Sequence, residues 1–87
     1  MPRYLLEREV GEFTEEAMKA AFDRETEVGE QMPGVRWIRS YYSAEEGKLY
    51  CEYEAPNLEI VLEFNRRVGI PVDRATVVQN LEPSMFR

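Results

Sequence analysis

Two polar residues fall inside the apolar stripes of the helices that this sequence predicts. At about 100° per residue, Glu25 lies in the middle of a stripe formed by Met18, Ala21, Phe22, Val28 and Met32. By the same arithmetic, Asn65 lies in the middle of a stripe formed by Leu58, Val61, Leu62 and Val68. Because an apolar stripe faces the protein interior, each predicted helix directs one polar side chain toward the sheet on which it packs.

Glu25 has the richest chemistry of the two, because an unpaired buried carboxylate costs several kcal/mol and must find a partner. The side chains expected opposite it, those of Ser40, Tyr42 and Tyr53, can donate hydrogen bonds. One interpretation is a ligand-binding pocket, with Glu25 as a base of raised pKa, formed by Glu25, Asn65, Tyr42, Tyr53 and Cys51. The other interpretation is a satisfied polar core without a ligand, and the sequence leaves both open.

The composition excludes several catalytic chemistries. The chain contains no histidine, which removes the commonest general base near neutral pH and the commonest ligand of nickel, copper and catalytic zinc. Ser-His-Asp and Cys-His arrangements are therefore excluded. The single cysteine, Cys51, cannot form a disulfide within the chain, and its place in an apolar strand indicates a small buried side chain.

The charge balance bears on partners and location. A net charge of −6 opposes binding to nucleic acid or to an anionic membrane, because both need an excess of Lys and Arg. No apolar run approaches the roughly 20 residues of a membrane helix, and the first residues lead straight into an alternating segment rather than a signal peptide. We therefore expect a cytoplasmic protein.

The elements that position these residues follow from the hydrophobic pattern. We expect strands at 3–9, 35–43, 48–54 and 72–79, and helices from the N-cap Thr14 to about Met32 and from the N-cap Asn57 to Gly69. The order β-α-β-β-α-β predicts a single α+β domain, residues 1–87, of ferredoxin-like architecture, with an antiparallel sheet and two helices on one face. Residues 81–87 form a tail with enough apolar content to add a short edge strand.

A turn at residues 44–47 sets the register of the central hairpin and sorts its side chains onto two faces. It pairs Ser40 with Cys51 and Ile38 with Tyr53, and it turns these residues toward the helices. The outward face then carries an aromatic and charged patch composed of Trp37, Arg39, Tyr41 and Tyr50. Such a patch marks an interface, so we expect a homodimer with facing sheets, in an assembly like an α/β-barrel; the alternative is a monomer with a decorated face.

Several segments resemble a family of small bacterial proteins called domain of unknown function 4242. The resemblance covers nearly the whole chain and rests on Pro2–Arg8, Gly34–Trp37, Ser40-Tyr41, Cys51–Pro56 and Gly69–Pro71. It implies a ferredoxin-like fold and a homodimer, and some relatives are described as nickel-binding. Relatives often carry a histidine near the position of Asn65, which this chain lacks. We therefore carry over the fold and the dimer, but not nickel coordination.

Three functions remain in competition. The first is a small dimeric protein that binds a small ligand in a cleft. The second, suggested by the relatives and the acidity, is binding of a divalent metal ion by Glu7, Glu52 and Glu54. The third is a cofactor-independent enzyme in which Glu25 is the base, which rests on analogy between folds. We favour the first.

Overall fold

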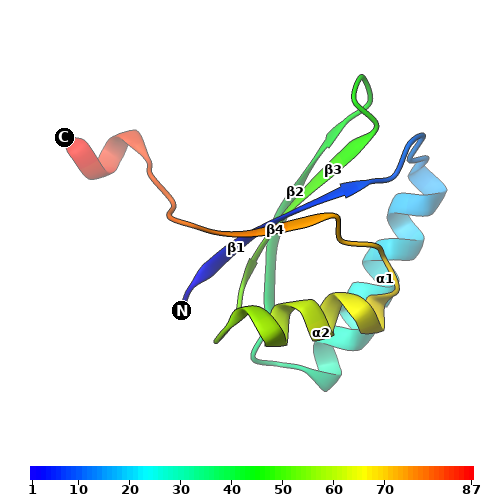
Figure 1. Ribbon diagram of the computed structural model, residues 1–87, viewed down its shortest axis with the longest axis horizontal. Coiled ribbons are helices and arrows are strands. Elements are labelled where there is room, and N and C mark those ends of the chain that lie inside the picture. The colour runs from blue at the N-terminus through cyan, green and yellow to red at the C-terminus, as the bar shows by residue number, and fades with distance from the viewer.

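The computed structural model of residues 1–87 has the β-α-β-β-α-β order, with both helices on the same side of one sheet (Figure 1). The strands are β1 (Arg3–Glu9), β2 (Arg36–Ser43), β3 (Lys48–Glu54) and β4 (Arg74–Val78), and the helices are α1 (Glu15–Gln31) and α2 (Leu58–Val68). The sheet order is β2-β3-β1-β4, and every neighbouring pair is antiparallel. The predicted ferredoxin-like architecture is confirmed. Neither helix combines the length and the apolar content needed to span a membrane.

Both helices begin and end where their capping residues predict. The Thr14 hydroxyl accepts a hydrogen bond from the Ala17 amide at 3.1 Å, and the Asn57 side chain accepts one from the Ile60 amide at 2.9 Å. These contacts satisfy amides that the first helical turn leaves free. Gly69 ends α2 with a φ of 85°, in the left-handed region that favours glycine.

The core lies between the sheet and the helices. Alternation along β1 turns Tyr4, Leu6 and Arg8 inward, and alternation along β3 does the same for Leu49, Cys51 and Tyr53. The buried face of α2 is formed by Val61, Phe64, Asn65 and Val68. Leu58 and Leu62, which the sequence placed in the buried stripe, are more than one-third exposed, because α2 packs on a face rotated toward Phe64.

The hairpin between β2 and β3 follows the predicted register only as far as Arg39, which pairs with Glu52. Beyond that point the register shifts at a β-bulge, and Trp37 pairs with Tyr53 rather than with Glu54. The extra residue, Ile38, reverses the alternation. Trp37 therefore faces the helices, where its ring lies 5.7 Å from that of Phe22. Its predicted place on the outward face is wrong.

The C-terminal tail also differs from the prediction. Residues Pro83–Phe86 form a short 3₁₀ helix instead of an edge strand. Proline has no amide hydrogen to donate to a sheet, and it suits the first turn of a helix. The tail extends away from the body of the molecule beyond β4 (Figure 1).

Candidate ligand-binding site

A cavity of about 200 Å³ lies between α1 and the helix-facing side of the sheet. Its walls are mainly apolar and include Phe13, Met18, Ala21, Trp37, Leu49 and Ile70. The side chain of Trp37 reaches this wall only because of the bulge in β2. The polar groups on the cavity wall are Arg8, Glu25, Ser40, Tyr42 and Cys51. A mainly apolar cavity with a few polar groups is the usual form of a small-molecule site.

Arg8 is the most unusual member of this wall, because a charged side chain with 1% exposure is rare in a domain of this size. Its Nη2 donates to the Asn65 Oδ1 at 2.8 Å and to the Tyr53 hydroxyl at 3.2 Å. Its Nη1 makes a long contact of 3.5 Å to the Pro71 carbonyl. The Nε–H of Arg8 has no hydrogen-bond partner, and it is the only buried side-chain nitrogen or oxygen in this state.

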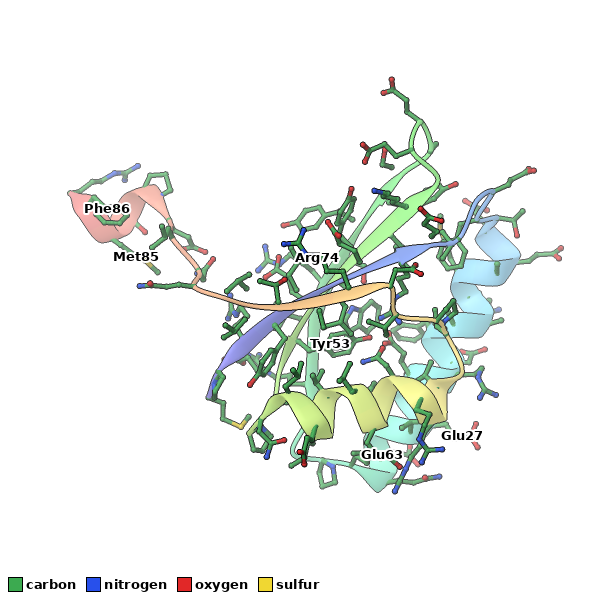
Figure 2. The ribbon with its side chains drawn as sticks, viewed as in Figure 1. Glu27, Tyr53, Glu63, Arg74, Met85 and Phe86 are labelled. Atoms are coloured by element: carbon green, nitrogen blue, oxygen red, sulfur yellow. The ribbon has the colours of Figure 1, made fainter.

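Glu25 is connected to Arg8 through Tyr53. The Tyr53 hydroxyl donates to the Glu25 carboxyl and accepts from Arg8, and Figure 2 shows Tyr53 between the sheet and the helices. No carboxylate oxygen lies within ion-pair distance of the Arg8 guanidinium. Burial raises the pKa of Glu25 from 4.5 to about 7, against the opposing effect of the Arg8 charge. A carboxyl group with this pKa can exchange a proton with a bound molecule near neutral pH.

The remaining polar groups of the cavity are already hydrogen-bonded to other protein groups. The Tyr42 hydroxyl donates to the Gly11 carbonyl at 2.8 Å and accepts from the Phe13 amide at 3.1 Å. The Ser40 hydroxyl accepts from the Trp37 indole at 2.9 Å and donates to the Cys51 sulfur at 3.0 Å. Arg8 and Glu25 are consequently the groups left to bind the polar part of a ligand.

The structure brings the five predicted ligand-binding residues into one region, in two layers. Glu25, Tyr42 and Cys51 line the cavity directly. Tyr53 and Asn65 do not line it, but both contact Arg8 beneath it. Arg8 is not among the site residues predicted from the sequence. The signal was available, because alternation in β1 places Arg8 on the same face as the apolar Tyr4 and Leu6.

The three carboxylates predicted as metal ligands lie on the opposite face of the sheet. Each has arginine neighbours: Glu52 lies 3.8 Å from both Arg3 and Arg39, Glu54 pairs with Arg36, and Glu7 lies 4.0 Å from Arg74. No three Cys, Asp or Glu side chains come close enough together to hold a metal ion. The structure does not bring Glu7, Glu52 and Glu54 together as a ligand set.

The other residues of the predicted interface patch do lie on this outer face. Arg39 and Tyr41 from β2 stand beside Glu52 and Tyr50 from β3. Tyr41 is 54% exposed, and the Tyr50 hydroxyl donates to Glu46 at 2.8 Å. The patch keeps three of its four predicted members and loses Trp37.

Fold and site together define a small α+β protein of ferredoxin-like architecture with one buried arginine beside an apolar cavity. The chain belongs to the family described as "Nickel responsive protein SCO4226-like", whose model matches residues 4–78. The crystal structure of SCO4226 from Streptomyces coelicolor A3(2) has a similar fold, with a TM-score of 0.80 and 20% sequence identity over 92% of this chain and 99% of that chain. No curated protein matches the chain. Membership under the name domain of unknown function 4242 stays a prediction.

The family description raises the question of whether this chain fits a nickel ion. Imidazole is absent from the whole sequence, and the available carboxylates and the one thiol are not clustered. Nitrogen and sulfur donors are those that nickel favours. The residues of one chain therefore do not fit a nickel site.

Proposed function

We propose that this chain is a small-ligand-binding protein and that the ligand occupies the cavity beside Arg8 and Glu25. The observation that carries the proposal is the buried Arg8 in the cavity wall, whose guanidinium keeps one donor, the Nε–H, without a partner. A buried donor without a partner costs about 1–3 kcal/mol. Few native groups remain in that state, and a bound molecule is one way to satisfy such a group.

The size and the lining of the cavity support a small, mainly apolar molecule. An apolar cavity of about 150 Å³ holds a benzene ring, so a volume of about 200 Å³ has room for such a ring with one small polar group. Cavities that bind drug-sized ligands are larger, about 300–1,000 Å³. The ligand therefore has an apolar body against Trp37 and Leu49 and a single polar head toward Arg8 and Glu25.

Trp37 provides a direct test, because it is the only tryptophan of the chain and lies in the cavity wall. We expect a fitting ligand to change the Trp37 emission and to raise the unfolding midpoint, since ligand that binds only the folded state stabilises it. The variant Ala21→Phe fills the cavity from α1 and is expected to abolish both effects. A screen of small apolar acids, amides and alcohols that gives no change in either signal would refute the proposal.

We also propose that two copies pack through their outer sheet faces. No helix covers this face (Figure 1). Its rows of arginine and glutamate, such as Arg39 beside Glu52, are self-complementary about a two-fold axis. The projecting tail carries further exposed apolar side chains, including Met85 and Phe86 (Figure 2).

We expect light scattering to give a molar mass of about twice the 10.2 kDa of one chain. Tyr41→Glu places a charge on the outer face at the edge strand β2, where Tyr41 is 54% exposed, and should give a monomer. Leu62→Glu is the matched control, because Leu62 is similarly exposed but lies on α2. A wild-type monomer, or a dimer that only Leu62→Glu disrupts, would contradict this arrangement.

The family description favours a second candidate, a response to nickel ions. Since one chain does not cluster suitable donors, such a site would need carboxylates from two copies. Calorimetric titration with nickel and manganese separates the candidates. Ligand binding in the cavity predicts no metal affinity better than about millimolar. Micromolar nickel affinity that Glu52→Gln removes would establish the metal function instead.

A further inference from the structure

The buried guanidinium of Arg8 lacks a counter-ion, unlike most arginines of this chain. Those with a carboxylate oxygen within 4.0 Å are Arg3, Arg36, Arg39, Arg66, Arg67 and Arg74, none of which is buried. The acceptors around Arg8 are the neutral Tyr53 hydroxyl, Asn65 amide and Pro71 carbonyl. Removing a charge from water without an opposite charge is costly, so the cavity carries an uncompensated positive charge at its base.

We propose that the ligand is a small monocarboxylate, whose carboxylate pairs with the guanidinium of Arg8 in the cavity wall and whose apolar body lies against Trp37 and Leu49. This inference rests on the proposed function and specifies its ligand class. The carboxylate supplies the anion that Arg8 lacks. A charge-assisted bond of this kind is roughly twice as strong as one between neutral groups.

Glu25 shares the cavity and would repel a carboxylate if it were ionised. Its burial raises its pKa to about 7, so at about pH 6 most molecules carry a neutral carboxyl group there. In that form Glu25 is a hydrogen-bond donor. Arg8 and Glu25 can then both donate to the two oxygens of one carboxylate.

Other head groups suit the cavity less well. A cation would face the positive charge of Arg8. A phosphate needs several donors for its oxygens, whereas the Tyr42 and Ser40 hydroxyls are already engaged with protein groups. A neutral amide leaves the charge of Arg8 uncompensated.

Three planar molecules of nearly equal shape test this preference for a carboxylate over other head groups. They are benzoate, an anion; benzamide, a neutral amide; and benzamidine, a cation. Their binding is measured at about pH 6 by calorimetry and by the emission of Trp37, which lines the cavity. We expect benzoate to bind at least about tenfold more tightly than benzamide, and benzamidine not to bind. Equal or tighter binding of benzamide or benzamidine would overturn the carboxylate inference and leave the proposed small-ligand function standing. Failure of all three to bind would overturn both.

A variant of α2 tests the role of the uncompensated charge. Asn65→Asp places a carboxylate where Oδ1 now lies 2.8 Å from Arg8 Nη2, and it does so without touching the cavity wall. We expect it to weaken benzoate binding to the level of benzamide and to leave benzamide binding unchanged. Lys19→Gln, an exposed change on α1 with the same effect on net charge, is the matched control and should change neither affinity. An Asn65→Asp protein that is folded by circular dichroism and binds benzoate as tightly as the wild type would overturn the inference. If this variant does not fold, the ligand series on the unaltered chain still supports or overturns the inference.

Discussion

Replacing Glu25 by Gln should stabilise this protein at neutral and alkaline pH. The pKa of Glu25 is raised from 4.5 to about 7 by burial, so the folded protein holds a proton in this interval that the unfolded chain has lost. A group of this kind contributes stability at low pH, and the contribution disappears as the pH rises through the folded pKa. The interval from 4.5 to about 7, at about 1.4 kcal/mol per pH unit, corresponds to about 3 kcal/mol.

The amide introduced by Glu25→Gln resembles the neutral carboxyl group in shape and still offers an oxygen to the Tyr53 hydroxyl, which in the wild type donates to Glu25. The variant therefore keeps the hydrogen bond and avoids the buried negative charge. We expect equal stabilities at about pH 4.5 and an advantage of the variant that grows to about 3 kcal/mol by about pH 8.

Urea unfolding of both proteins at a series of pH values measures this difference directly. The other carboxylates titrate in both proteins and cancel in the comparison. Glu27→Gln, the same change at an exposed position of α1 (Figure 2), is the control and should show little pH-dependent difference. Parallel curves for Glu25→Gln and wild type, or a variant that loses stability as the pH rises, would refute the burial argument.

Two further predictions concern the frame around the site. Arg24 on α1 donates hydrogen bonds to two carbonyls at the end of α2, that of Val68 and, at 3.0 Å, that of Arg67. Arg24→Ala should therefore lower the free energy of unfolding by about 1 kcal/mol. An unchanged urea midpoint would show that this contact is not stabilising. Gly47 has a φ of 65°, and a Cβ there would lie 3.2 Å from the Gly11 backbone. Gly47→Ala should therefore cost about 1–2 kcal/mol in thermal or urea unfolding, and the same change at Gly29, which has open space around it, should cost nothing.

The sequence by itself determines the elements and their order. Thr14 and Asn57 begin their helices, and Gly69 ends α2, through hydrogen bonds with backbone groups a few residues away. Such local contacts can be predicted without knowing the rest of the fold. Helical periodicity likewise places Glu25 and Asn65 toward the interior, because the helix period is the same in every protein. Both are buried in the structure.

Only the tertiary structure decides how the site is assembled. The bulge at Ile38 turns Trp37 from the outer face to the cavity, and no local pattern reveals it, since one inserted residue reverses the alternation of a strand. The hydrogen bonds of Arg8 with Tyr53 and Asn65 join residues that are separated by 45 and 57 positions in the sequence. It exists because β1 lies in the middle of the sheet under both helices, and that placement follows from the packing of all the elements together.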